Sequence, residues 1–184
     1  GPLYQIDTDT YSSGLIMKSY GAIAAGGDGT IYVTYISYDT TASPFIRMYC
    51  AVTSDAGRTW RHSVVSNVWL LPNEFGYAQG YSVAADPLRN GHAAVFWIDE
   101  RYGDGDIVMK ETYDYGNTWG PIVRINSDPA DNGIEQDLVW AQYSAEGKLA
   151  VAWRDRRLSV PGASAPFDIY ARVSTDGGGS FGPD

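Results

Sequence analysis

Two short segments of this 184-residue chain each hold an aspartate and an arginine two positions apart. Segment 97–101 reads W-I-D-E-R and segment 153–157 reads W-R-D-R-R, so both follow the pattern W-x-D-x-R. Because side chains two apart on a strand point to the same side, the two charged groups of each segment can pair. Two interpretations stay open: an ion pair that orders the loop after a strand, or a polar rim that contacts a ligand. The candidate ligand-binding residues are Asp99, Arg101, Asp155 and Arg157.

Residues 68–79 combine aromatic rings with amides and a carboxylate. Tryptophan and tyrosine rings present flat apolar faces that stack on the C–H faces of sugars, while amides and carboxylates bind hydroxyl groups. The same residue types also plug the centre of ring-shaped folds, and this packing role is an equal alternative. The candidate ligand-binding residues here are Trp69, Glu74 and Tyr77, accompanied by Asn73, Phe75 and Gln79.

Oxygen donors for a hard cation are concentrated in residues 127–135. Asp128, Asp131 and Glu135 are close enough in sequence to form a calcium site, although an acidic loop without a metal is the alternative. No other cofactor is expected.

Thiol and imidazole chemistry have few candidates. The single cysteine, Cys50, lies in an apolar run and is expected to be a buried small side chain. No Cys/His cluster has zinc spacing. His62 and His92 stand at the starts of expected strands and form no triad with a serine, so each is expected to be solvated or packed.

A third pattern, [S/T]-x-D-x-G-x-[S/T]-[W/F], occurs at 53–60, 112–119 and 174–181, with its aspartates 59 and 62 positions apart. The aspartate can accept hydrogen bonds from backbone N–H groups nearby, and the glycine supplies a positive φ. The terminal aromatic ring can pack back as an apolar plug. The pattern predicts three structural hairpin turns, which we call the D-x-G turns, rather than a set of catalytic aspartates. Their residues are Asp55, Gly57, Trp60, Asp114, Gly116, Trp119, Asp176, Gly178 and Phe181.

The segments between these turns show period-2 alternation, which predicts strands throughout, and no segment carries a helical stripe. Four antiparallel strands per repeat of about 60 residues are typical of a β-propeller blade, so we predict an all-β propeller module over 1–184. The blade-like repeats cover about 9–67, 68–126 and 127–184, and the last repeat lacks a fourth strand.

The first residues, 1–8, resemble the end of the second repeat. They begin G-P-L-Y-Q-I-D, and residues 120–126 read G-P-I-V-R-I-N. We therefore expect residues 1–8 to be the fourth strand of another blade. The alternative is a tag remnant at 1–2 followed by a linker.

The formal net charge of −9 and the scattered positions of 13 basic residues exclude a nucleic-acid groove, which requires clustered positive charge. No run of 18 apolar residues occurs, so no membrane-spanning segment is expected in this sequence.

On its D-x-G turns, the chain resembles the Asp-box (BNR repeat) proteins, above all the sialidase-like β-propellers, over nearly its whole length. The resemblance implies a ring of usually six blades, an extracellular or cell-surface location, and binding of or action on glycans. It also implies that the D-x-G turns lie on the face away from the ligand. The segments that it places on the ligand face are 7–18, 68–79, 97–101, 127–135 and 153–157.

Catalytic residues do not carry over by this resemblance. Sialidases use three arginines, a tyrosine nucleophile with a glutamate, and an aspartate. Their Arg-Ile-Pro motif is absent here, and segment 45–47 (F-I-R) has the wrong order. We therefore expect a glycan-binding or scaffolding module without complete catalytic machinery. The alternatives are a glycoside hydrolase of exo-sialidase type, or part of one, and a protein-interaction propeller. The arginines that could form a clamp are Arg101, Arg154, Arg156, Arg157 and Arg172.

Three blades are half of such a ring, and an open arc would expose two apolar faces. Either the chain is part of a longer polypeptide, or two copies close the ring as a homodimer, with residues 3–7 of one copy completing the third blade of the other.

Overall fold

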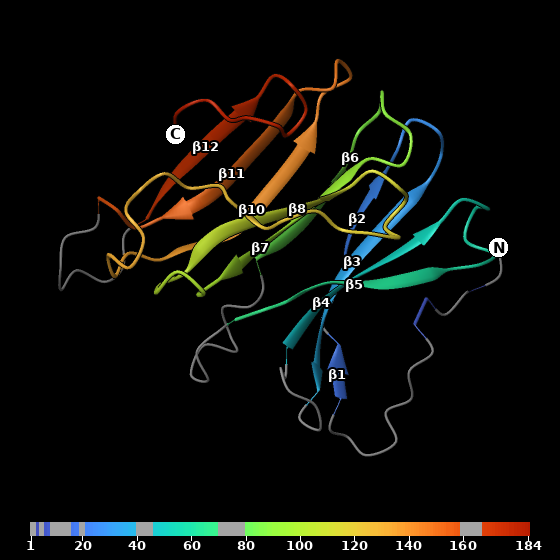
Figure 1. Ribbon diagram of the computed structural model, residues 1–184, viewed down its shortest axis with the longest axis horizontal. Coiled ribbons are helices and arrows are strands. Elements are labelled where there is room, and N and C mark those ends of the chain that lie inside the picture. Colours follow the sequence, from blue (N-terminus) through green and yellow to red (C-terminus); the bar gives the residue numbers. More distant parts are fainter. Residues whose placement is uncertain are drawn as a thin grey trace.

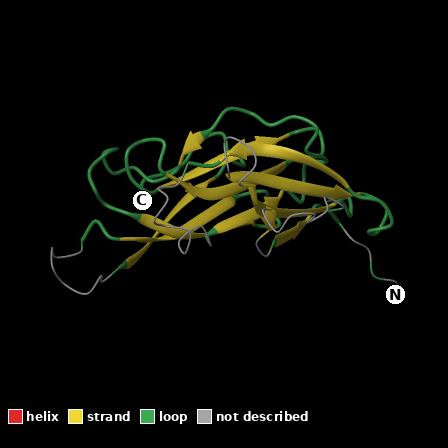
Figure 2. Ribbon diagram, turned by 90° about the horizontal axis from the view of Figure 1, so that it is seen from below, coloured by secondary structure: helices red, strands yellow, loops and turns green. Residues whose placement is uncertain are grey.

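The computed structural model describes residues 3, 6–7, 16–18, 21–39, 46–69, 80–158 and 167–184. Within these ranges the chain forms strands and no helix, so the predicted all-β class is confirmed. Three antiparallel sheets follow one another along the sequence and fan out side by side (Figure 1). Seen from the side, the strands of the sheets lie in one flattened body with loops at its rim (Figure 2). No helix that could cross a membrane occurs in the described ranges.

Sheet 1 has two short strands, β1 (Ile16–Lys18) and β2 (Ala22–Ala25), that pair with opposite ends of the same long strand, β3 (Ile31–Asp39). β1 and β2 together take the place of the single strand that a four-stranded blade would have before β3. The sheet continues through β4 (Ile46–Thr53) to β5 (Arg61–Asn67) at its outer edge.

Sheet 2 contains β6 (Tyr81–Ala85), β7 (Ala93–Asp99), β8 (Asp106–Thr112) and β9 (Val123–Arg124), in that order. The fourth strand, expected over 120–126, is only two residues long. Beyond its C-terminal end the Ile125 N–H still donates to the Ile107 carbonyl at 2.8 Å, but the Ile107 N–H donates to the side-chain Oδ1 of Asn126 at 2.9 Å and not to a backbone carbonyl.

Sheet 3 contains β10 (Gln136–Tyr143), β11 (Leu149–Asp155) and β12 (Asp168–Ser174), so the three sheets are not three identical four-stranded blades. Of residues 1–8, the described ones, Leu3, Ile6 and Asp7, belong to no strand, and Leu3 is fully exposed. The assignment of 1–8 to another blade stays a prediction.

The hydrophobic core lies between the sheets in two clusters, one on each face of sheet 2. Trp97 and Val108 belong to the cluster shared with sheet 1, where they meet Met48 and Cys50. Phe96 belongs to the cluster shared with sheet 3. Because neighbouring residues of β7 point to opposite faces, one strand serves both cores. Burial of each large side chain stabilises the fold by about 1.5–3 kcal/mol.

The three D-x-G turns share one hydrogen-bond pattern. In the first, Asp55 accepts from the backbone N–H of Thr59 at 2.9 Å and from its hydroxyl at 2.7 Å. The Thr53 hydroxyl accepts from the Gly57 N–H at 3.0 Å. The corresponding atoms bond in the turns at 112–119 and 174–181. Backbone and side chain thus fix each turn together.

The glycine of each turn has a positive φ of 84°, 75° or 116°, as the pattern predicts. The residue before it is also left-handed, which the pattern does not reveal. Ala56, Tyr115 and Gly177 occupy this place with φ of 59°, 62° and 82°. A side chain is unfavourable there, so Ala56 and Tyr115 carry backbone strain that Gly177 avoids.

We expect the protein to lose stability as the pH falls from about 4 towards 2. Hydrogen bonds from the backbone and hydroxyl of Thr59 lower the pKa of Asp55 to about 2. Below its unfolded pKa of about 3.9 the unfolded chain binds more protons, so stability rises with pH across this window. Urea denaturation at pH 2.5, 4 and 6 measures the effect, and Asp55→Asn should flatten the slope. Equal slopes for the variant and the natural sequence would contradict this explanation.

Candidate functional site

The candidate site lies at the edge of the sheets opposite the D-x-G turns. The register pairs Asp99 at the end of β7 with Asp106 at the start of β8, and the D-x-G turn begins at the other end of β8. Likewise, Gln136 at the start of β10 pairs with Asp155 at the end of β11. We call the loops 99–106, 126–137 and 155–158, together with Trp69, the polar edge. Most of its aspartates and arginines are brought close together in ion pairs.

The first W-x-D-x-R segment forms a closed network around a fully buried carboxylate. Asp99 accepts from Arg101 Nε at 2.7 Å and from the Arg101 backbone N–H at 3.1 Å. Its other oxygen accepts from the Trp97 indole N–H at 2.9 Å. The geometry is that of an ion pair that orders the loop. The Asp99 carboxylate itself is not exposed to a ligand.

The second segment repeats this network. Asp155 accepts from the Trp153 indole N–H at 2.9 Å and from Arg157 Nη2 at 2.7 Å. Burial raises the pKa of Asp155, but the hydrogen bonds from Arg157 and Trp153 outweigh it, so the pKa is lowered overall. Arg157 also bonds Asp184 at 2.9 Å and lies 4.1 Å above the Tyr170 ring. Both its charge and its flat face are therefore held inside the protein.

A third arginine–aspartate cluster, absent from the sequence predictions, lies at the start of β10. Asp137 is only 2% exposed and accepts from Arg154 at 2.6 and 2.8 Å and from Arg156 at 3.0 Å. Two guanidinium groups on one carboxylate give this cluster a net positive charge. Arg156 Nη1 has no hydrogen-bond partner in the described part of the protein. The one sequence signal for the cluster is the density of arginines in 153–157.

A backbone irregularity places Asp137 in this cluster. The pairing of β10 with β11 shifts between Asp137 and Trp140, and Leu138 has a φ of 48°. Gly80, at the start of β6, makes room for this bulge: an added Cβ there would lie 2.5 Å from the Leu138 backbone nitrogen. A strained residue of this kind often marks a functional site.

The predicted calcium ligands do not meet. Asp128 accepts hydrogen bonds from Asn126, Asn132 and Gln136, which occupy its oxygens. Asp131 lies against Gly103 and Glu135 lies against Gly105, at separate places on the loop that precedes β8. In the ranges that the structure describes, no three His, Cys, Asp or Glu side chains converge on one point. The loop is ordered by amide and guanidinium donors in place of a cation.

Two aspartates in this region, Asp104 and Asp106, each have one buried oxygen without a hydrogen-bond partner among the described residues. Asp106 is fully buried, with Oδ1 bonded to Arg124 and Asn126, while Oδ2 has no partner among the described residues. Burial raises the pKa of Asp106, and the nearby charge of Asp104 adds to this effect.

Trp69 combines a fixed backbone with an exposed ring. Its N–H donates to Asp99 Oδ2 at 3.3 Å, and its carbonyl accepts from the Glu100 N–H at 2.8 Å. The side chain is nevertheless 62% exposed. The buried Asp99 network therefore holds an aromatic platform at the surface of the polar edge. The other candidates of this segment, Glu74 and Tyr77, lie outside the described residues, as do Asn73, Phe75 and Gln79.

The remaining titratable candidates lie away from the polar edge. Cys50 is fully buried, and burial raises the pKa of its thiol to about 12. His92 is also buried, with Nδ1 3.0 Å from Asp86 and Nε2 3.1 Å from Glu111. Its ring stacks on Tyr113 with the centroids 4.4 Å apart. Both predictions of packed side chains are confirmed.

Comparison with known proteins shows the fold. No family model matches the chain, and no curated protein matches it by sequence. Among solved structures, an α-L-arabinanase of Penicillium chrysogenum complexed with arabinobiose matches with a TM-score of 0.64 and 18% identity. The match covers 91% of this chain and 49% of the arabinanase.

Two further structures agree. A Hadza microbial sialidase matches with a TM-score of 0.62 and 15% identity, over 89% of this chain and 36% of the sialidase. An α-L-arabinofuranosidase of Fusarium graminearum matches with a TM-score of 0.59 and 17% identity, over 90% of this chain and 47% of the arabinofuranosidase. The chain has the sialidase-like propeller fold and spans half or less of these structures. Its three sheets are hereafter called blades.

Proposed function

We propose that this chain is an extracellular carbohydrate-binding propeller module of the Asp-box type, and that it binds sugar at the polar edge. The observation that carries the proposal is Trp69, whose ring is 62% exposed on a backbone fixed at both its N–H and its carbonyl. A rigid aromatic face loses little conformational entropy when a sugar ring stacks on it.

Polar groups for sugar hydroxyls lie next to this platform. Arg101, which bonds the same Asp99 as the Trp69 backbone, keeps 24% of its side chain exposed. Its Nη2 bonds the Asn67 carbonyl at 2.9 Å, which fixes the guanidinium. A guanidinium has five N–H donors in a rigid fork, so one hydroxyl or carboxylate can be bound in addition. The arabinanase of similar fold was solved with arabinobiose, which supports a glycan ligand.

The ion pairs of Asp155 and Asp184 favour a binding role over the role of a catalytic acid for these two carboxylates. A glycosidase acid must hold a proton near neutral pH. The pKa of Asp155 is instead lowered, and the hydrogen bonds of Ser127 and Arg157 outweigh burial to lower the pKa of Asp184 to about 2. Carboxylates of this kind stay ionised and orient arginines.

A glycoside hydrolase is the second candidate, on the strength of Asp137. This buried carboxylate lies at the start of β10, beside the strained Leu138 and the guanidinium groups of Arg154 and Arg156. Hydrolysis of fluorogenic arabinosides or sialosides that is lost in Asp137→Asn would establish this candidate. A protein-interaction propeller is the third, and it predicts neither turnover nor sugar binding.

We expect Trp69→Ala to weaken glycan binding at least about tenfold, because loss of a central stacking ring costs more than about 1.4 kcal/mol. A glycan array first selects the ligand, and titration calorimetry then measures the affinity. Trp69→Phe keeps an aromatic face and should retain most of the affinity. Leu88→Ala, which truncates a side chain that is 64% exposed in another loop, is the control. Equal affinities of Trp69→Ala and the control would refute the proposed platform.

A further inference from the structure

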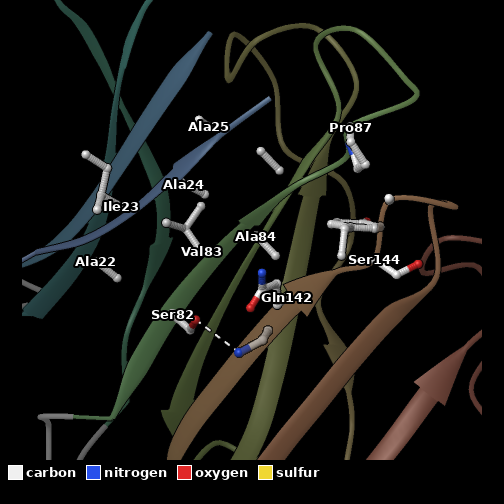
Figure 3. A pocket seen from close by; sticks show the side chains of 14 residues that line it. Ala22, Ile23, Ala24, Ala25, Ser82, Val83, Ala84, Pro87, Gln142 and Ser144 are labelled. Atoms are coloured by element: carbon white, nitrogen blue, oxygen red, sulfur yellow. Dashed lines mark hydrogen bonds between the residues drawn. The ribbon is translucent and has the colours of Figure 1, made fainter. Parts of the chain in front are cut away.

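Two cavities between the blades differ in the residues that line them. The cavity between β2, β6 and β10 has a volume of about 470 Å³ and is lined mainly by small side chains such as Ala22, Ala24 and Ala84 (Figure 3). None of its described lining residues is charged. A second cavity, of about 510 Å³, lies between the D-x-G turns of blades 1 and 2, and we call it the junction cleft. Its lining includes Asp28, Thr30, Ser54, Trp60, Arg61 and Tyr115.

The wall that blade 2 contributes to the junction cleft is fixed by hydrogen bonds. The Tyr115 N–H donates to the Gly91 carbonyl at 3.0 Å, and the Tyr115 carbonyl accepts from Arg61 Nη2 of blade 1 at 2.5 Å. The Tyr115 hydroxyl hydrogen-bonds the Asp28 carboxylate, which also belongs to blade 1. The cleft is therefore formed without a ligand, and a ligand would lose little affinity to the ordering of its walls.

An ionised carboxylate and an unpaired hydroxyl lie close together at the junction cleft. Asp28 is exposed; burial raises its pKa, but the hydrogen bonds from Thr30 and Tyr115 outweigh burial, so the pKa is lowered overall. The Tyr32 hydroxyl is buried without a hydrogen-bond partner among the described residues. Burial raises the pKa of Tyr32, and the nearby charge of Asp28 adds to this effect, so the hydroxyl stays neutral. A buried hydroxyl without a partner is unfavourable, and a donor from a ligand would satisfy it.

The junction between blades 2 and 3 is built from the same strands and turns but is filled by larger side chains. Strand register and the D-x-G pattern equate three residues of the first junction with three of the second: Thr30, Val52 and Ser54 correspond to His92, Glu111 and Tyr113. The space that is open at the first junction is thus occupied by the protein itself at the second.

Basic side chains occupy this second junction. The buried His92 ring has its Nδ1 3.0 Å from Asp86 and stacks on Tyr113. Arg89 donates to Asp86 at 2.6 Å and to the Gly177 carbonyl of blade 3 at 3.1 Å. The protein therefore places basic groups of its own beside a carboxylate and an aromatic ring. The junction cleft also has a carboxylate and aromatic rings, but a small threonine side chain stands in the place of the histidine.

The side chains that distinguish the junction cleft are not required by the turns. At the second junction, alanine or glycine holds the places of four of them: Tyr32, Arg61, Tyr115 and Asn117 correspond to Ala94, Gly120, Gly177 and Gly179. Tyr115 has a φ of 62°, a strained value that glycine adopts freely. Strain at a residue that the turn does not require indicates a role for its side chain.

We propose that the junction cleft binds an arginine side chain from a peptide segment of a partner protein. A guanidinium group is planar, so it can stack on the ring of Trp60 or Tyr115. Its N–H groups can at the same time donate to the Asp28 carboxylate and the Tyr32 hydroxyl. Arg61 is part of the wall, because its guanidinium is bound to the Tyr115 carbonyl. The net charge of −9 attracts a basic partner at long range.

A nuclear magnetic resonance titration of the 184-residue chain with the peptide acetyl-Gly-Arg-Gly-amide tests the proposal. The matched probe has glutamine in place of arginine, and it keeps polar N–H groups without the charge. We expect saturable amide shifts at 28–30, 59–61 and 115–117 with the arginine peptide and none with the glutamine peptide. The site lies at the D-x-G turns, so the result does not depend on glycan binding at the polar edge.

Two variants and a control locate the binding site. Asp28→Asn keeps an acceptor for the Thr30 N–H and removes the charge, so the arginine peptide should bind about tenfold more weakly. Tyr115→Gly gives the turn the residue that the third turn has at Gly177, so it should stay folded and bind about threefold more weakly. Asp168→Asn removes an exposed carboxylate of blade 3 and should leave the affinity unchanged.

Four results would overturn the proposal. The first is equal binding of the arginine and glutamine peptides, and the second is a set of shifts confined to the polar edge. The third is an affinity of Asp28→Asn equal to that of the Asp168→Asn control. The fourth is equally tight binding of a lysine peptide, which would show that the cleft recognises positive charge and not a planar guanidinium group.

Discussion

Gly80→Ala is expected to lower the free energy of unfolding by about 3 kcal/mol, the upper end of the range for overpacking. The added Cβ would lie 2.5 Å from the Leu138 nitrogen and 2.6 Å from its Cα. Both are backbone atoms of the strained bulge in β10. Backbone atoms have no alternative rotamer, so only a shift of β10 itself can relieve the clash. The blade 2–blade 3 contact and the position of Asp137 should both be disturbed.

Gly120→Ala is the matched control for this clash. Its added Cβ would meet the Glu111 carbonyl oxygen at 3.5 Å, an ordinary contact, and its φ is not in the left-handed region. We expect a change within about 1 kcal/mol, and a small gain is consistent with the lower entropy of the unfolded chain. Urea denaturation with comparison of midpoints and m-values measures both variants. Equal midpoints would show that β6 and β10 do not approach as closely as described.

Asp155→Ala is expected to cost about 3 kcal/mol, because it removes one partner of a buried ion pair and leaves a buried indole N–H without an acceptor. The change strands the Trp153 indole N–H, which is fully buried, and leaves Arg157 with the more distant support of Asp184. Asp155→Asn keeps an acceptor for the indole and should cost less. Thermal unfolding followed by near-ultraviolet circular dichroism reports on the tryptophan environment directly.

Asp168→Ala is the control for this prediction. Asp168 is the cross-strand partner of Asp155 but is exposed, so its removal should change stability by no more than about 0.5 kcal/mol. If Asp155→Ala lowered the stability as little as Asp168→Ala, the W-x-D-x-R network would contribute little to the stability of the protein.

The strands and turns could be predicted from the sequence because local physics determines them. The aspartate and glycine of the D-x-G turns impose the hairpin, and period-2 alternation gives the strands on either side. The strand expected after the first D-x-G turn is present as Arg61–Asn67. The bond from the Ile107 N–H to the side chain of Asn126, in place of a backbone acceptor, could not be predicted from period-2 alternation.

The polar edge was only partly predictable. The pairing of Asp99 with Arg101 was predicted from their spacing and the structure shows it, although Arg101 lies in the turn after β7 and not on the strand itself. Asp137 meets Arg154 and Arg156 only through the bulge at Leu138, which depends on the close approach of Gly80 from another blade. Such long-range geometry leaves no local pattern. Sequence proximity also made Asp128, Asp131 and Glu135 candidates for one cation, but Asp131 lies against Gly103 and Glu135 against Gly105.

The central claim, that the polar edge binds carbohydrate, is tested most directly by a nuclear magnetic resonance titration with arabinan and sialylated oligosaccharides. Proximity of a sugar shifts the resonances of nearby amides and of the Trp69 indole. We predict saturable shifts at Trp69, at 99–106 and at 155–158, with the D-x-G turns at 53–60 and 112–119 unchanged. Shifts confined to the D-x-G turns, or no shifts with any glycan that the array selects, would contradict the claim.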